Sequence, residues 1–500
     1  MAVVNSIGNI CCSIAVSLLC LVPITGVAGN LPFEIVQPQE GLDTNSRFYK
    51  AYPGLEYRVR LAVMGGSYPY AYELQENPDG MTINRLGEIV WPEPSARTNP
   101  YAISVLVTDT EGLTEEVSWQ VTVTKAGFFF VDAENGRSTS SGGRGTLENP
   151  WRSMGDVYGD GGKFQANNPD GFVYWRNGEY SLEGEFEDCN SSEGCRLAWY
   201  AGKKPSVWLA YPGERPTINF NRNGVDGYIL FDQGTDNLYI DGFRLDNNSN
   251  TRGKSLSIVN NGNITIRNNI FEGLTNCESG GNNSHLFFPG GDGRYLAVQD
   301  NLVSDSCGYW LLGYSSPYAV VESNDIYSDI PLPIGPKSNI ENWTIRANHI
   351  KGQTSLGAIW NQEYGYSGSI EINYNLIEME NSNGVAVKLL SSNPGGEIFV
   401  NRNTLIGHVV VQSLQSTKGP WYFEENIIIN DSSNSDKISR SSTVDESRLI
   451  VNNNLVGNGA DGIIGDNGQL TEEYSEYLGQ RGHQLGTEPR GPAPARAVYQ

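Results

Sequence analysis

The sequence predicts an all-β protein in which an antiparallel β-sandwich precedes a right-handed, single-stranded parallel β-helix. Three observations support this fold class. Short runs alternate between apolar and polar residues before residue 124, and an asparagine recurs every 23 to 32 residues from residue 269 onward. The chain also has 500 residues, which is too long for one ordinary domain, and its 38% hydrophobic content can build large cores.

The amino-terminal segment has the features of a secretory signal peptide. A mostly apolar run at 14–24 is followed by the small residues 26–29, and the first charged side chain is Glu34. We therefore expect residues 1–29 to be removed and the mature protein to be secreted, either extracellular or periplasmic. A membrane anchor is the open alternative, although the run is short for a spanning helix.

Residues 31–124 carry the β-sandwich pattern. In runs such as 101–108 and 117–123, apolar residues alternate with other residues at every second position, and turn residues separate the runs. The segments 68–94 and 101–113 resemble the Ig-like, cadherin-like modules that precede catalytic domains in secreted bacterial enzymes. The resemblance implies a structural or sugar-associating role for this module.

A different repeat fills residues 128–490, and only a polar tail at 491–500 follows it. Eight segments align on one asparagine, and the residues three before and two after it are apolar in every copy. Short strands in repeats of this length indicate a solenoid of parallel strands, in which the asparagines would stack as a buried ladder. The asparagines are Asn269, Asn301, Asn324, Asn348, Asn375, Asn403, Asn426 and Asn454.

The start of this region also resembles a known family. Residues 128–154 and 172–180 are similar to the opening of pectate-lyase-like β-helix proteins, with a strand, a Gly-Thr-x-x-x-Pro turn and a strand that ends in Gly-x-Tyr. The resemblance implies the fold and a polysaccharide-degrading enzyme. It does not select the activity, because this solenoid hosts lyases, hydrolases, epimerases and phage depolymerases.

Four cysteines follow the predicted signal peptide. Cys277 and Cys307 stand at nearly the same place on successive coils, so we expect them to form a disulfide. Cys189 and Cys195 would close a short loop in the same way. Metal binding is less favoured, since no Cys-x-x-Cys pair or neighbouring histidine is present.

One strand of each coil is expected to line the substrate groove. In β-helix polysaccharide enzymes this is the strand that precedes the asparagine strand, and period-two alternation assigns its outward side chains. These side chains and nearby loop aromatics suit a sugar polymer, because aromatic faces stack on sugar rings and amides bind hydroxyls. The predicted substrate-binding residues are Tyr314, Trp360, Gln362, Gln412, Trp310 and Tyr364, with Lys337, Lys388 and His285 on the same face.

The groove composition favours a polysaccharide lyase. β-Elimination needs a base beside a uronate and a cation that neutralises its carboxylate. Residues 337–338 resemble the Lys-Ser motif of alginate and chondroitin lyases, which implies Lys337 as the base. The arginine of that family is missing from 359–362, so Lys388, His285 or Arg294 would replace it.

Other functions stay open at this point. A hydrolase would need converging carboxylates, for which Asp292, Asp305 and Glu363 are available. A uronate epimerase would use the same proton abstraction as a lyase. A non-catalytic glycan-binding protein or adhesin would use the groove only for stacking.

The charge balance limits the partners of the protein. A net charge of −23 argues against nucleic acid binding, whereas an acidic polysaccharide, such as an alginate, a pectate or a glycosaminoglycan, can be met by a local strip of lysines. Calcium could bridge substrate and protein carboxylates, with Asp292 and Glu363 as ligands. We expect a monomer that leaves the membrane once the signal is cleaved.

Overall fold

The computed structural model describes most of the chain between residues 31 and 457. The predicted signal peptide and polar tail lie outside the described residues, which are 31–39, 46–158, 171–181, 195–199, 206–220, 227–231, 237–247, 254–258, 262–274, 284–288, 295–314, 316–327, 329–337, 340–354, 356–363, 368–391, 396–415 and 419–457.

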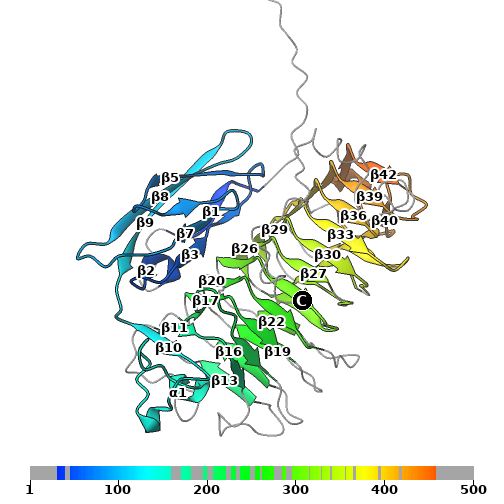
Figure 1. The fold of residues 1–500 in the computed structure, drawn as a ribbon. Helices are drawn as coiled ribbons and strands as arrows, with labels where there is room; N and C mark the ends of the chain where they lie inside the picture. The colour runs from blue at the N-terminus through cyan, green and yellow to red at the C-terminus, as the bar shows by residue number, and fades with distance from the viewer. Residues whose placement is uncertain are drawn as a thin grey trace, which may run out of the picture.

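Almost all regular structure in these residues is β-strand, as the sequence predicts (Figure 1). The α-helix α1 (Met154–Tyr158) and three short 3-10 turns, η1 (Arg47–Tyr49), η2 (Thr139–Ser141) and η3 (Glu446–Arg448), are the exceptions among them. No helix in the described part of the chain has the length and apolar character needed to cross a bilayer.

The amino-terminal module is an Ig-like domain built from three small sheets. Strand β9 shows why the chain folds this way, because exposed and buried residues alternate along it up to Val123 and only one of its faces meets the core. The sheets are β1 (Glu34–Gln37) with β4 (Ala62–Met64); β3 (Tyr57–Arg60), β7 (Glu88–Trp91) and β6 (Thr82–Ile83); and β2 (Lys50–Ala51), β9 (Thr114–Val123), β8 (Tyr101–Thr108) and β5 (Ala71–Glu76).

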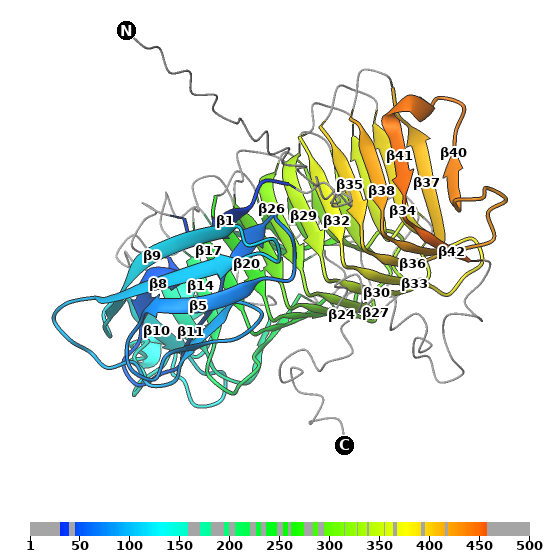
Figure 2. The same ribbon diagram turned by 90° about the horizontal axis from the view of Figure 1, so that it is seen from above.

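The rest of the described chain is a parallel β-solenoid of three sheets. Consecutive strands of each sheet come from successive coils. The coils therefore stack along one axis, and each sheet runs along that axis as one face of the solenoid (Figure 2). The twelve-stranded sheet contains β10 (Phe128–Val131), β11 (Gly171–Trp175), β14 (Ser206–Ala210), β17 (Leu238–Asp241), β20 (Ile264–Arg267), β23 (Leu296–Gln299), β26 (Pro317–Glu322), β29 (Glu341–Arg346), β32 (Ile370–Asn373), β35 (Ile398–Asn401), β38 (Trp421–Glu424) and β41 (Leu449–Asn452).

The other two sheets complete each coil. The eleven-stranded sheet contains β12 (Glu179–Ser181), β15 (Thr217–Asn219), β18 (Arg244–Asp246), β21 (Ile270–Glu272), β24 (Leu302–Ser304), β27 (Asp325–Tyr327), β30 (His349–Gly352), β33 (Leu376–Met379), β36 (Thr404–Ile406), β39 (Ile427–Ile429) and β42 (Leu455–Gly457). The ten-stranded sheet contains β13 (Cys195–Trp199), β16 (Gly227–Phe231), β19 (Lys254–Ile258), β22 (Ser284–Phe288), β25 (Tyr309–Gly313), β28 (Ile334–Pro336), β31 (Ile359–Glu363), β34 (Val385–Ser391), β37 (His408–Ser413) and β40 (Ile438–Arg440).

The predicted asparagine ladder is confirmed. It runs along the corner between the twelve-stranded and eleven-stranded sheets, and each side-chain amide from Asn269 to Asn426 donates to the Oδ1 of the asparagine on the next coil at 2.9–3.2 Å. The same Oδ1 accepts the preceding asparagine's backbone N–H at 2.9–3.1 Å. The asparagine side chains therefore satisfy buried backbone N–H groups that, because the chain turns there, have no partner in the β-sheets.

The residue before each ladder asparagine has a left-handed backbone. Its φ lies between 53° and 58° in eight coils, although Ala347, Tyr374, Arg402 and Glu425 are residue types that rarely adopt this conformation. Three of these side chains bind one another, since Arg402 contacts Glu425 at 2.8 Å and Tyr374 at 3.0 Å. Side-chain contacts along this corner thus accompany the unfavourable backbone conformation.

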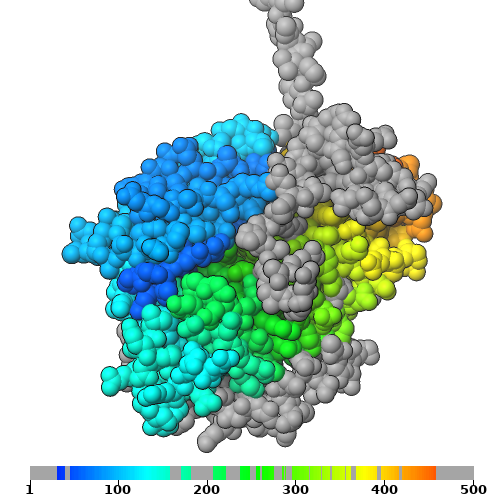
Figure 3. Space-filling model, viewed as in Figure 1, coloured from blue at the N-terminus to red at the C-terminus, as the bar shows by residue number. Residues whose placement is uncertain are grey.

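The Ig-like domain packs on the outer face of the twelve-stranded sheet. Its hydrophobic core is continuous with outward side chains of the first coils, including Phe130, Tyr174, Leu209 and Tyr239. Figure 3 shows the blue domain in direct contact with the green coils of the solenoid. The two parts therefore share buried apolar surface, which favours a fixed arrangement over a flexible tether.

A buried charge network extends this interface. Glu322 of β26 lies 3.3 Å from Arg60 of the Ig-like domain and 2.5 Å from Arg346 of β29, which donates in turn to the carbonyl of Val63. Burial alone would raise the pKa of Glu322, but the two guanidinium groups outweigh it and hold that pKa below its ordinary value. Asp300 adds a second ion pair to Arg60.

Cys307 is disulfide-bonded in the structure. Its predicted partner, Cys277, lies outside the described residues, as does Cys189. Of Cys195, only the backbone, at the start of β13, is described. Both predicted pairings therefore stay predictions.

Loss of one ladder side chain should destabilise the solenoid strongly. We expect Asn348→Ala to lower the free energy of unfolding by roughly 3 kcal/mol or more, because it removes the buried acceptor of the Asn324 backbone N–H and of the Asn324 side-chain amide. Asn452→Ala, at an exposed asparagine, should cost about 0.5 kcal/mol or less. Chemical denaturation midpoints measure both, and equal losses would contradict a special role for the ladder.

Removal of the shared counter-charge should weaken the interface between the domains. We expect Glu322→Gln to lower the free energy of unfolding by about 3–5 kcal/mol, because Arg60 and Arg346 stay buried without it. Glu56→Gln, which breaks a half-exposed pair with Arg58, should cost less than about 1 kcal/mol. Calorimetry would show the Ig-like domain melting separately in Glu322→Gln; an unchanged thermogram would contradict the prediction.

Candidate functional site

The candidate site is the outer face of the ten-stranded sheet from β25 to β37, here called the candidate face. One column of register partners points into the core and so fixes the orientation of this sheet. All its members are fully buried; they are Leu311, Ile334, Ile359, Val387 and Val409. Side chains one position later on these strands point to the opposite side of the sheet. They include Trp360, Lys388 and Val410, which are half-buried.

Trp360 and Lys388 form the closest cation–aromatic pair on this face. The two residues are register partners on β31 and β34, and the Lys388 Nζ lies 4.6 Å from the centroid of the Trp360 ring. At this distance the ring face stabilises the charged ammonium. The Trp360 Nε1–H is shielded from water and has no hydrogen-bond partner among the residues that the structure describes.

Tyr314 and Lys337 repeat this arrangement two coils earlier. Gly313 pairs with Pro336, which places Tyr314 beside Lys337, and the Lys337 Nζ lies 5.5 Å from the centroid of the tyrosine ring. The backbone N–H of Lys337 donates to the Gly313 carbonyl at 2.7 Å, so the sheet itself holds the lysine in place. Both side chains are half-buried.

The structure brings the two pairs and Gln412 to one surface. Lys337 lies two coils before Lys388 and two register positions further along its strand, which puts the two backbones about 12 Å apart. Gln412 is exposed on β37, one coil beyond Lys388. Leu390 and Val410, which the sequence analysis did not single out, add half-buried apolar side chains to this face.

Two predicted site residues do not face the groove. His285 and Trp310 are both fully buried, and their rings lie 5.6 Å and 6.3 Å from Phe271 of the solenoid core. The prediction for His285 assumed strict alternation along the strand, and Trp310 was predicted as a loop aromatic but lies on β25. At the start of these strands the chain turns a corner, so His285 and Leu286 both point inward, as do Trp310 and Leu311.

His285 is held as a neutral internal side chain. Its Nδ1 lies 3.0 Å from the Ser255 hydroxyl and its Nε2 lies 2.5 Å from the Ser306 hydroxyl. Burial lowers the pKa of His285 to about 3. It therefore supplies no positive charge for a substrate carboxylate, and the prediction that it does so is wrong.

The remaining predicted residues lie beyond what the structure describes. Asp292, Arg294 and Tyr364 are outside the described residues, and of Gln362 and Glu363 only the backbone, in β31, is described. Among described side chains, no three or more His, Cys, Asp and Glu are grouped to hold a metal ion. The predicted calcium ligands Asp292 and Glu363 thus stay predictions.

Sequence reasoning missed a polar cluster on the outer face of the eleven-stranded sheet. His349 lies 3.0 Å from the Tyr327 hydroxyl through Nδ1 and 2.6 Å from Glu378 through Nε2. Burial would raise the pKa of Glu378, but the contact with His349 outweighs it and lowers that pKa. Register between successive coils is the signal that would have found this cluster.

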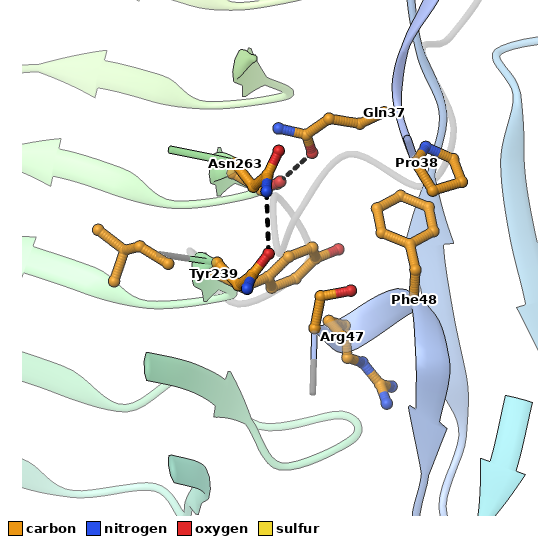
Figure 4. Close-up of a pocket in the computed structure, with 10 residues that line it drawn as sticks. Gln37, Pro38, Arg47, Phe48, Tyr239 and Asn263 are labelled. Carbon is orange, nitrogen blue, oxygen red and sulfur yellow. Dashed lines mark hydrogen bonds between the residues drawn. The ribbon is translucent and has the colours of Figure 1, made fainter. Parts of the chain in front are cut away.

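The pocket between the two domains is too small for a sugar. Gln37 and Phe48 of the Ig-like domain face Tyr239 and Asn263 of the solenoid across it (Figure 4). The space open to water is about 20 Å³, little more than one water molecule needs. Its walls are joined by a hydrogen bond from Thr265 to Gln37 at 2.5 Å. It is therefore part of the domain interface.

Comparison with known proteins gives a family for the amino-terminal domain. Residues 42–124 match the family model described as "Putative Ig domain". No curated protein and no solved structure matches the chain. The family match agrees with the resemblance seen in the sequence, and the β-solenoid rests on the structure alone.

The buried histidine predicts an acid-sensitive fold. The pKa of His285 is about 3 when folded and near 6.5 when unfolded, so between these values only the unfolded chain binds the proton. The stability contributed by this site is complete above about pH 6.5 and falls by about 1.4 kcal/mol per pH unit below it. Wild type should therefore lose more stability than His285→Gln between about pH 6.5 and about pH 5, as measured by urea denaturation. Parallel losses would contradict the prediction.

Proposed function

We propose that this protein is a secreted polysaccharide lyase that binds a uronic-acid-containing polysaccharide on the candidate face and cleaves it by β-elimination. The observation that supports this most directly is the pairing of lysines with aromatic rings at Tyr314–Lys337 and Trp360–Lys388. Aromatic faces bind sugar rings, and ammonium groups bind carboxylates, so the pairs suit an acidic sugar polymer.

The geometry favours different roles for the two lysines. Lys388 lies closer to its ring than Lys337 does, at 4.6 Å against 5.5 Å, so its ammonium group is the more closely held by an aromatic ring. We therefore assign Lys388 to bind a uronate carboxylate and Lys337 to act as base on the uronate that lies at its own position. Lys337 takes the proton next to the carboxylate of that uronate, the C–H electrons form the new double bond, the glycosidic C–O bond breaks, and solvent protonates the departing oxygen.

Elimination is preferred over hydrolysis because of the charges on this face. Glycoside hydrolysis by the usual route needs two carboxyl groups that flank the scissile bond. Among the described side chains of the candidate face, the charged groups on or directly after the central strands β28, β31 and β34 are the ammonium groups of Lys337 and Lys388. A face of this sign attracts uronates and suits the stabilisation of a carbanion next to a carboxylate.

The product distinguishes the proposed activity from its alternatives. Incubation with alginate, pectate and glycosaminoglycans should give the ultraviolet absorbance of an unsaturated uronate. New reducing ends without that absorbance would indicate a hydrolase, and altered uronate stereochemistry without cleavage an epimerase. Binding without any reaction would indicate a non-catalytic glycan-binding protein. Repeating the assay after chelation tests the proposed bridging calcium.

The lysine roles predict different kinetic losses. We expect Lys337→Ala to lower kcat by roughly 10²- to 10⁴-fold with little change in KM, because it removes the proton acceptor. Lys388→Met should lower kcat/KM and raise KM. Lys351→Ala, at an exposed lysine of the eleven-stranded sheet, is the matched control and should leave both constants unchanged. Full activity of Lys337→Ala would overturn the base assignment.

A further inference from the structure

The candidate face alternates in chemistry from coil to coil. Tyr314, Lys337, Trp360 and Lys388 stand after or on β25, β28, β31 and β34, which are four successive strands of the ten-stranded sheet. The order along the solenoid axis is aromatic, cation, aromatic, cation. In each pair the lysine is one coil after its aromatic ring, at the matching register position.

This order gives the face a repeat of two coils. Successive coils are about 4.8 Å apart, so the two ammonium groups are separated by about 10 Å along the axis, and so are the two rings. One sugar of an extended polysaccharide advances by nearly the length of one coil. The second pair is also displaced by two residues along the strands, so a chain that crosses the face obliquely meets an aromatic ring and an ammonium group in turn.

We propose that the substrate is an alternating copolymer in which each hexuronate is followed by an uncharged sugar. This inference rests on the proposed function, because it names the polymer that the candidate face binds. One uronate lies at Lys337, which acts on it as base, and the carboxylate of another lies against Lys388. The uncharged rings stack on Tyr314 and Trp360, where no charge has to be desolvated.

A homopolymer of uronates fits this face less well. Each ring stacked on Trp360 or Tyr314 would bring its own carboxylate to the aromatic position. The face of an aromatic ring is the negative part of its quadrupole and does not stabilise an anion. Half of the carboxylates would thus lie away from the two ammonium groups.

Binding to defined polymers tests this inference. The full chain should bind unsulfated chondroitin or hyaluronan, in which uronate alternates with an uncharged N-acetylated sugar, roughly tenfold more tightly than polygalacturonate or polymannuronate of equal length. Calorimetry with length-matched oligosaccharides measures the difference. Equal or tighter binding of the homopolymers would overturn the inference and leave the proposed function standing. Binding of neither class would overturn both.

Variants at Trp360 test the origin of the selectivity. Trp360→Leu should reduce binding of the alternating polymers by roughly tenfold and leave homopolymer binding nearly unchanged, whereas Trp360→Phe should keep most of the selectivity because stacking remains. Circular dichroism and the denaturation midpoint establish that each variant is folded. Retention of the full preference by folded Trp360→Leu would contradict the stacking role.

Discussion

The asparagine ladder is the constraint on which the rest of the solenoid depends. Each amide donates to the next coil and accepts two N–H groups from the previous one, so from Asn269 onward the ladder fixes where each coil turns and how it aligns with its neighbours. Period-two alternation then determines which side chains of the adjoining strands face inward. The columns of the candidate face inherit their register from this corner, because a slip of one residue would turn its lysines and rings into the core.

The Ig-like domain determines which outer face of the solenoid is available. It covers the early and central coils of the twelve-stranded sheet through a shared apolar core and through charges that neither part can bury alone, such as Glu322 between Arg60 and Arg346. Removal of the domain would expose both apolar rings and unpaired ions. The domain is therefore a structural part of the solenoid, and the polar, half-buried lysine–aromatic pairs lie on a different sheet.

The candidate site shows which side-chain directions the alternation along a strand predicts correctly and which it does not. This alternation placed Lys337, Trp360 and Lys388 on one face, and each stands one or three residues after the inward column. The predictions for His285 and Trp310 were wrong, because both stand one residue before that column. There the chain bends from the eleven-stranded sheet, and two successive side chains enter the core. Corner geometry depends on the packing of Phe271 from another sheet, which no local pattern encodes.

The sequence alone determined the two-domain all-β architecture, the solenoid and its ladder, because each depends on a short pattern repeated many times along the chain. Only the tertiary structure decided that the Ig-like domain lies on the twelve-stranded sheet, that His285 is a neutral internal residue and that each lysine lies over a ring. These features arise from contacts between residues far apart in the chain, such as Arg346 with Val63. Their energies come from burial and from charge pairing in space, and neither of these appears as a repeated pattern in the sequence.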